Sequence, residues 1–250
     1  MTEWYAKTVR NALSVGMVTL LGCGCASIRS KSLPPPPDRY TVAAESRALN
    51  IRVRSETDNN FREVGDAVRK AVEGRLAAEG FRIAPTMFDI GVDLRVSVEE
   101  FDVSGEYFRF AGNVDVSVHR SPDSRLLGRD TIALRGERML GRAKALGTLA
   151  DQLAQATAEF VSRAVAPDHA DLGVEEITIR RGVFTRGDAT YKLRFAELVS
   201  RLDGVISCRL VDENLPDRAM TFRVVYFREN FPAGLLNRIR LIPELGLPQQ

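Results

Sequence analysis

The chain has 250 residues, of which 44% are hydrophobic and 27% are charged, a composition typical of a globular protein with one large or two small domains. Lys and Arg number 35 against 33 for Asp and Glu, and basic residues form no extended run. These values exclude a disordered chain and a chain wholly embedded in a membrane, and they give no basis for nucleic-acid binding.

The amino-terminal segment predicts an export signal. Lys7 and Arg10 provide a short positive region, and residues 12–21 provide an apolar one. An apolar stretch of about ten residues is too short to span a bilayer, which takes about 20. A buried amino-terminal helix is the alternative, but Gly16 and Gly22 would weaken such a helix.

The apolar run ends in Leu20-Leu21-Gly22-Cys23. These residues resemble the lipobox of bacterial lipoproteins, in which a leucine, a small residue and then a cysteine are recognised together. The resemblance implies that residues 1–22 are a signal peptide and that Cys23 becomes the lipidated first residue of the mature chain, carrying acyl chains such as palmitate. Several acyl chains hold a protein firmly on a membrane. Gly24 stands where many inner-membrane lipoproteins have Asp, which implies the periplasmic face of the outer membrane.

Residues 23–46 are predicted to form a tether. Four consecutive prolines, Pro34 to Pro37, favour an extended, semi-rigid segment. Two further cysteines remain. Cys25 lies in this tether, and Cys208 alternates with apolar residues, which predicts a buried small hydrophobic side chain rather than a reactive thiol.

Residues 47–166 predict a two-layer α+β domain. A strand at 48–54 is followed by a helix at 60–80, where Asn60 and Glu63 resemble a capping box and Gly80 ends the helix. Alternating apolar residues then predict an antiparallel meander with one covered face, and a second amphipathic helix completes the two layers. The expected strands and helix lie at 91–98, 107–119, 126–134 and 144–165.

The polar segment 166–173 predicts a linker to a smaller module at 172–243. This module has the order β-α-β-β-α, with a three-stranded sheet and two helices on one side. Its expected elements lie at 174–184, 189–204, 205–211, 219–227 and 233–239. The last strand is apolar on both faces, since Val225 and Phe227 alternate with Val224 and Tyr226. One face is therefore covered by the first domain or is an interaction surface.

The order of elements in the module resembles the ring-building modules of periplasmic secretion, sporulation and flagellar machines. The order in the first domain resembles the α+β domains of outer-membrane assembly lipoproteins, such as the curli-secretion lipoprotein, and of the periplasmic protein of the Tol system. Both resemblances imply an assembly role. The first half of the module is basic and its hairpin is acidic. This separation of charge predicts either head-to-tail stacking of copies or an ordinary solvated surface. The basic residues are Arg180, Arg181, Arg186, Lys192, Arg194 and Arg201, and the acidic ones are Asp212, Glu213 and Asp217.

The sequence predicts no catalytic, cofactor or metal site, and hence no enzyme. His119 and His169 lack the spacing of metal ligands, and neither a nucleophile elbow nor a glycine-rich phosphate loop is present. The acidic cluster of Glu99, Glu100 and Asp102 lies on a predicted strand, where adjacent side chains cannot face one another without a bulge. We interpret the cluster as a solvated strand end.

Two functions from different classes follow. The first is a non-enzymatic assembly or scaffold component of a cell-envelope machine of the secretion or flagellar type, which binds other envelope proteins or further copies of itself. The alternative is an accessory lipoprotein that carries a lipid or lipopolysaccharide. The carrier predicts an apolar cavity lined by residues such as Phe108, Phe110 and Val114, whereas the scaffold predicts a filled core there. An enzyme of unfamiliar type, with groups converging from distant positions, is a third possibility.

Overall fold

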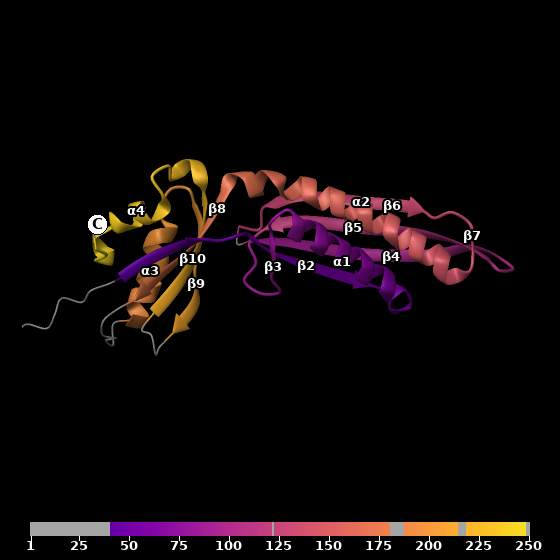
Figure 1. The fold of residues 1–250 in the computed structure, drawn as a ribbon, viewed down its shortest axis with the longest axis horizontal. Helices are drawn as coiled ribbons and strands as arrows, with labels where there is room; N and C mark the ends of the chain where they lie inside the picture. Colours follow the sequence, from indigo (N-terminus) through magenta and orange to yellow (C-terminus); the bar gives the residue numbers. More distant parts are fainter. Residues whose placement is uncertain (1–40, 122, 181–187, 215–218, 249–250) are drawn as a thin grey trace, which may run out of the picture. The chain divides into compact units, whose positions relative to one another are not determined.

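The computed structural model describes residues 41–121, 123–180, 188–214 and 219–248 (Figure 1). All of these described residues belong to one compact unit. The predicted signal peptide, Cys23 and most of the predicted tether lie outside the described residues. Among the residues described, no helix is both long and apolar enough to span a bilayer.

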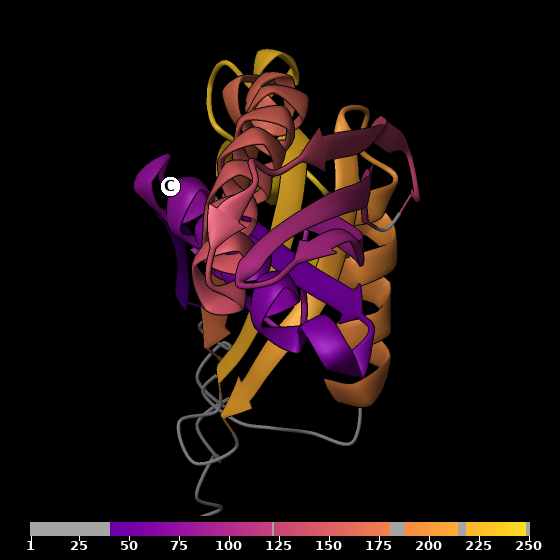
Figure 2. The same ribbon diagram turned by 90° about the vertical axis from the view of Figure 1, so that its right-hand side faces the viewer.

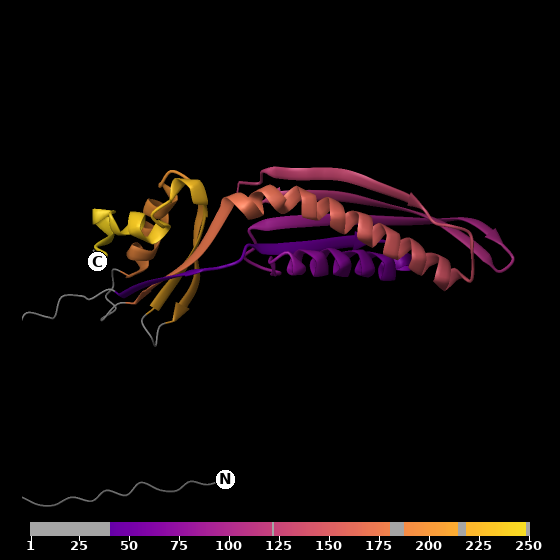
Figure 3. The same cartoon turned by 45° about the horizontal axis from the view of Figure 1, so that its top comes forward.

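The larger sheet has the strand order β3-β2-β4-β5-β6, and a short strand, β7, pairs with β5. Its strands are β2 (Asn50–Thr57), β3 (Arg82–Ile83), β4 (Ile90–Ser104), β5 (Tyr107–Arg120), β6 (Leu126–Arg135) and β7 (Met139–Leu140). Two helices, α1 (Arg62–Ala78) and α2 (Arg142–Asp171), run side by side along one face of this sheet (Figure 3). Valines and leucines at alternate positions of β4 and β5 turn towards these helices, which confirms the α+β class and the antiparallel meander.

The strand β2 departs from the predicted antiparallel arrangement, because it pairs in parallel with β4 and β3. The reason is the connection, since α1 crosses over between β2 and the following strands and returns the chain in the same direction. The larger sheet is therefore mixed.

Both ends of α1 are formed by local contacts. A 3-10 turn, η1 (Asn59–Phe61), precedes it, and the Asp58 side chain accepts from the Asn60 N–H at 3.3 Å. The cap position of α1 itself is Phe61, without a side-chain cap, so the predicted Asn60 and Glu63 capping box is wrong. At the other end Gly80 adopts φ +93°, and the N–H groups of Gly80 and Phe81 donate to carbonyls of the last turn, a Schellman motif that confirms Gly80 as the stop.

The helix α2 is longer than predicted, at 30 residues. The linker predicted at 166–173 instead forms the last turn of α2 and the start of the next strand. Pro167 lies inside the helix, where it removes one backbone hydrogen bond, but Val165 and Asp168 stay buried against the fold and the helix continues to Asp171. Burial outweighs the polar, proline-containing pattern here.

The smaller sheet has the order β1-β8-β10-β9, with every pair antiparallel. Its strands are β1 (Thr41–Ser46), β8 (Leu172–Arg180), β9 (Val205–Asn214) and β10 (Ala219–Phe227), and its helices are α3 (Asp188–Ser200), α4 (Leu235–Arg240) and the 3-10 turns η2 (Arg228–Asn230) and η3 (Pro243–Leu245). Figure 2 shows α3 alongside β9. The β-α-β-β-α order is as predicted, while β1 is a fourth strand in a segment that we assigned to the tether. Val42 and Ala44 explain it, since they alternate along β1 and pack on the core beneath. The boundary between a larger domain and a small module stays a prediction.

Two hydrophobic cores meet at β10. Phe222, Val224 and Tyr226 belong to the core under α3 and α4, where the rings of Phe195 and Phe222 lie 4.2 Å apart. Val225 points the other way and joins the core of the larger sheet, together with Val174 of β8 and Leu172. Of the two interpretations of this strand, coverage by the first domain is therefore the one observed.

Candidate interaction surfaces

Arg223 of β10 forms a buried ion pair where the two sheets meet. Its Nη2 lies 2.7 Å from Oδ2 of Asp89, the residue before β4, and the two side chains are only 5% and 4% exposed. The same nitrogen donates to the Ala48 carbonyl at 2.6 Å. Charges buried this deeply persist only when they are paired and hydrogen-bonded, so the contact fixes the smaller sheet against the start of β4.

Further polar groups complete this cluster. Asp89 Oδ2 accepts the backbone N–H of Asn50 at 2.7 Å, and Glu176 of β8 accepts from Arg223 at 3.3 Å and from Arg47 at 2.9 Å. Arg47 directly follows β1. The cluster thus connects the segment between β1 and β2, through Arg47, Ala48 and Asn50, to β8, β10 and the start of β4. Sequence reasoning missed it, although an arginine within the apolar strand "AMTFRVVYF" was the available signal.

A second buried arginine, Arg120 at the end of β5, lies nearby on the larger sheet. It donates to Asp123 in the following turn at 2.6 Å and approaches Asp168 of α2 at 3.6 Å. The hydrogen bond from Arg120 lowers the pKa of Asp123, whereas burial raises the pKa of Asp168. The Arg120 guanidinium also lies over the ring of Phe227, at the end of β10, at 5.6 Å. Each sheet therefore contributes one buried arginine to the region where the two sheets meet.

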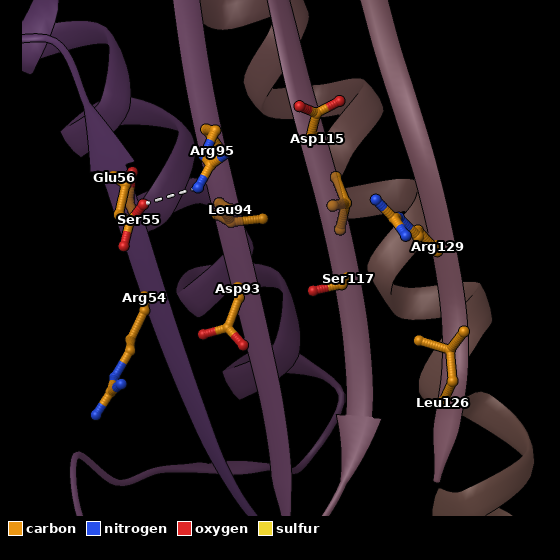
Figure 4. A pocket seen from close by; sticks show the side chains of 11 residues that line it. Arg54, Ser55, Glu56, Asp93, Leu94, Arg95, Asp115, Ser117, Leu126 and Arg129 are labelled. Atoms are coloured by element: carbon orange, nitrogen blue, oxygen red, sulfur yellow. Dashed lines mark ion pairs between the residues drawn. The ribbon is translucent and has the colours of Figure 1, made fainter. Parts of the chain in front are cut away.

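The face of the larger sheet opposite the helices is polar (Figure 4). A hollow of about 620 Å³ lies over it. Two cross-strand rows of side chains cross this face, and all of their members except Thr131 line the hollow: Arg54–Asp93–Ser117–Arg129 and Glu56–Arg95–Asp115–Thr131. Arg95 lies 3.6 Å from Glu56, and Thr131 donates to Asp115 at 2.7 Å. Opposite charges therefore alternate along each row, which is typical of a solvated sheet face.

The two histidines lie in different places. His119 of β5 is half-buried, with its Nδ1 3.6 Å from an Asp93 oxygen, which is too long for a hydrogen bond. His169, predicted in a linker, is exposed on the last turn of α2 and packs against Phe81, with ring centroids 4.6 Å apart and ring planes tilted by 48°. Within the described ranges, His, Cys, Asp and Glu residues form no group of three or more that could hold a metal ion.

Two other predictions about individual side chains can be compared with the structure. A bulge does occur in the acidic cluster, but it falls between Glu100 and Asp102 and leaves Glu99 and Glu100 on opposite faces. Glu100 pairs with Arg142 at 3.3 Å. Cys208 on β9 is half-buried, and burial raises the pKa of its thiol to about 12, so the thiol is protonated at neutral pH.

The space between helices and sheet in the larger layer is filled. Phe110 and Val114 are fully buried in the core and Phe108 packs against it. The ring of Phe110 meets that of Phe61 edge-on at 6.4 Å, and a Cβ on Gly112 would lie 2.6 Å from a methyl carbon of Leu153. Side chains of α1 and α2 thus occupy the position where a carried lipid would bind.

One ion pair joins the predicted basic and acidic parts of the smaller sheet within one molecule. Lys192 of the basic helix α3 forms an ion pair with Glu213 of the acidic strand β9, and Arg201 pairs with Glu197. Arg181, Arg186 and Asp217 lie outside the described residues. Because α3 and β9 lie side by side, opposite charges meet within one molecule at Lys192 and Glu213. Head-to-tail stacking of copies through these residues stays a prediction.

No protein-family model and no curated protein matches the chain. Among solved structures, the chain is similar to a minor lipoprotein from Acinetobacter baumannii, at 12% identity over 46% of this chain and 92% of that one, with a TM-score of 0.32. It is also similar to rare lipoprotein B from Shewanella oneidensis, at 13% identity over 48% and 94%, with a TM-score of 0.29. A third is the PelC dodecamer from Paraburkholderia phytofirmans, at 15% identity over 51% and 97%, with a TM-score of 0.30. The first two are bacterial lipoproteins. Similarity this low leaves the function to be argued from the residues of the chain itself.

Proposed function

We propose that the protein is a lipoprotein, anchored through Cys23 to the periplasmic face of the outer membrane, that acts as a non-enzymatic assembly or scaffold component of a cell-envelope machine of the secretion or flagellar type. Its partners are other envelope proteins or further copies of the chain. The observation that supports this proposal most is the buried Arg223–Asp89 pair, which joins the two sheets.

A scaffold must hold its binding surfaces at fixed positions relative to its anchor. The last six residues of the predicted tether form β1, which pairs along its whole length with β8. The strand β8 pairs with β10, and Arg223 of β10 binds Asp89 at the start of β4. Backbone pairing and one buried ion pair therefore lead from the anchored end of the chain to the larger sheet.

The carrier alternative has less support. A lipid carrier needs an apolar space of several hundred Å³ between its layers. In this protein Phe110 and Val114 are packed beneath α1 and α2, and Leu153 lies against Gly112. The filled core agrees with the scaffold and gives a lipid no room between the helices and the larger sheet.

The first experiment measures membrane attachment and native mass of the full-length protein extracted in mild detergent. Cys23→Ala should abolish incorporation of labelled palmitate and release the protein from the membrane fraction, while Cys25→Ala, two residues away, should change neither. Persistence of lipid labelling in Cys23→Ala would refute the anchor. A discrete assembly larger than one chain, or retention of an envelope protein, supports the scaffold, whereas a monomer that copurifies with lipid supports the carrier.

A further inference from the structure

Three arginines lie together on the polar face of the larger sheet, at the edge formed by β2 and β3. Arg52 and Arg54 stand two residues apart on β2 and point to the same face, while Val53 between them points into the core. Arg82 of β3 belongs to the same face, because it lies opposite Asn50 in the parallel pairing of the two strands. Opposite charges alternate over the rest of this face, whereas like charges are neighbours at this edge.

The acidic residue that lies opposite Arg54 is directed to another side chain. Asp93 of β4 is the cross-strand neighbour of Arg54, but its carboxylate lies 3.6 Å from His119 of β5. The side chain of Arg54 points away from Asp93, towards the open edge of β2 (Figure 4). Within the described part of the chain, none of the three arginines at this edge forms an ion pair. Their charges are therefore left for solvent or for a bound anion.

An aromatic ring holds Arg52 in place. The Cζ atom of its guanidinium lies 3.7 Å from the centre of the Phe88 ring, which is a close cation–π contact. The residues on both sides of Phe88 are fixed, since Asn50 donates to the Met87 carbonyl at 2.9 Å and Asp89 belongs to the buried ion pair that joins the two sheets. The guanidinium is thus oriented by the fold before any ligand binds.

Arg52 lacks a partner both for its charge and for one of its donors. Its Nε is buried and has no hydrogen-bond partner in the described chain. Burial lowers the pKa of Arg52 most, the nearby charge of Arg54 lowers it further, and the opposing effect of Asp93 is the smallest of the three. An anion that contacts both guanidiniums would supply the missing charge and accept hydrogen bonds from both side chains.

We propose that Arg52 and Arg54 bind a phosphate group, with Arg82 at the side of the site. Arginine donates to phosphate oxygens in pairs, and a guanidinium already stacked on a ring loses little conformational freedom on binding. Several guanidiniums around one group favour phosphate over carboxylate, because phosphate carries more charge and more acceptor oxygens. Arg54 also lines the hollow of about 620 Å³, which leaves room for the remainder of a ligand. The phosphate belongs to a small soluble molecule or to a lipid headgroup.

Titration of the full-length protein in a neutral, mild detergent tests the site. The probes are inorganic phosphate, glycerol 3-phosphate and dihexanoyl phosphatidic acid, each compared with acetate at equal ionic strength. The NMR signals of the Arg52 and Arg54 Nε–H groups, assigned by their loss in Arg52→Gln and Arg54→Gln, report binding. Phosphate should shift both signals with a dissociation constant on the order of 1 mM or lower, and acetate should bind more weakly.

The three probes distinguish the two sources of phosphate. Equal binding of all three assigns the site to a soluble phosphate, and much tighter binding of phosphatidic acid assigns it to a lipid headgroup. Failure of all three to shift the Arg52 and Arg54 signals overturns the site, and so does equal binding of phosphate and acetate.

Substitutions separate this site from general attraction to a charged face. Arg54→Gln should weaken phosphate binding roughly tenfold, because charge-assisted hydrogen bonds are lost. Arg129→Gln is the matched control, since Arg129 is an exposed arginine at the far end of the same cross-strand row, and it should leave the affinity unchanged. Phe88→Leu keeps every charge and removes the ring beneath Arg52, so it should weaken binding several-fold. Equal losses in Arg54→Gln and Arg129→Gln, or an unaltered affinity in Phe88→Leu, overturn the inference.

The phosphate site goes beyond the proposed scaffold function and does not depend on it. Absence of phosphate binding in a protein that still assembles or retains an envelope protein overturns the site and leaves the scaffold standing. A monomer that retains no envelope protein, but binds phosphate through Arg52 and Arg54, refutes the scaffold and supports the site.

Discussion

Replacing Arg223 by methionine tests whether the buried ion pair joins the two sheets. Methionine keeps an unbranched apolar stem and removes the guanidinium, leaving the Asp89 carboxylate, which is 4% exposed, without its cation. Oδ2 of Asp89 still accepts a hydrogen bond from the Asn50 N–H at 2.7 Å. The Ala48 carbonyl loses its donor, Arg223 Nη2, which lies 2.6 Å away in the wild-type protein. The substitution therefore leaves a buried charge and a carbonyl with fewer partners.

The expected loss of stability can be estimated from such pairs. Removing one partner of a buried ion pair costs about 3–5 kcal/mol. For a protein of this size, each kcal/mol lowers the melting temperature by about 2–4 °C, so Arg223→Met should lower it by about 6–20 °C. Arg47→Met is the matched control. Arg47 binds the same Glu176 but is 45% exposed, and its loss should cost at most about 1 kcal/mol.

Urea unfolding of a chain that starts at Asp38 measures the free energy of unfolding of both variants. The double variant Arg223→Met/Asp89→Leu is compared with them. The double variant should recover most of the lost stability, since an apolar pair of similar volume has no charge to bury. The reasoning is wrong if Arg223→Met unfolds within about 1 kcal/mol of Arg47→Met, or if the double variant is less stable than the single one.

Three further predictions concern single side chains. Gly112→Val should cost about 1–3 kcal/mol in urea unfolding, because a methyl carbon of Leu153 lies 2.6 Å from the position of the new Cβ; an unchanged midpoint would contradict this packing. Burial raises the pKa of Cys208 to about 12, so iodoacetamide at pH 8 should alkylate it only after unfolding, and labelling of the native protein at the rate of a free thiol would be contrary evidence. Burial also raises the pKa of Asp168 above 3.8, so its contribution to stability is present below that pH and is lost as the pH rises through the folded pKa. Asp168→Asn should therefore reduce the loss of stability between acid and neutral pH, and an unaltered pH profile would refute the assignment.

Regular alternation and helical spacing made most elements of this fold predictable. Val92, Leu94 and Val96 alternate on β4 because one face of the sheet lies under α1 and α2 while the other meets water. Gly80 was predictable as a helix end because the left-handed conformation at that position favours glycine. In such segments the local pattern and the tertiary environment agree.

Two elements depended on partners distant in the sequence. The strand β1 has one valine and two alanines as its apolar residues and follows four prolines in the sequence. It becomes a strand because β8, about 130 residues later, supplies its hydrogen bonds. The end of α2 contains Pro167 and polar residues typical of a linker, and burial of Val165 and Asp168 keeps it helical. A prediction from neighbouring residues sees neither β8 nor the core that buries the end of α2.

The candidate surfaces were predictable to different degrees. The apolar residues on both sides of β10 predicted that this strand is covered or binds a partner, and the structure shows it covered, with Val225 in the core of the larger sheet. Arg223 in the apolar strand signalled a buried partner, but the partner, Asp89, lies 134 residues earlier and could not be identified from the sequence. An arginine inside an apolar strand requires a buried anion, but the sequence alone does not say which one.

The buried pair also bears on the choice between scaffold and carrier. A carrier must open a path for lipid between its layers, and an opening of the larger layer would separate α1 and α2 from β4 and β5, whose side chains form one core. At its start, β4 is held through Asp89 to β10, and β10 is joined through β8 to β1, the first strand of the described chain. From that point β4 continues for 15 residues, about 50 Å, towards its hairpin. A long strand held at its start by a buried ion pair keeps its far end in place, which is the mechanical requirement of a scaffold and the opposite of what release of a lipid requires.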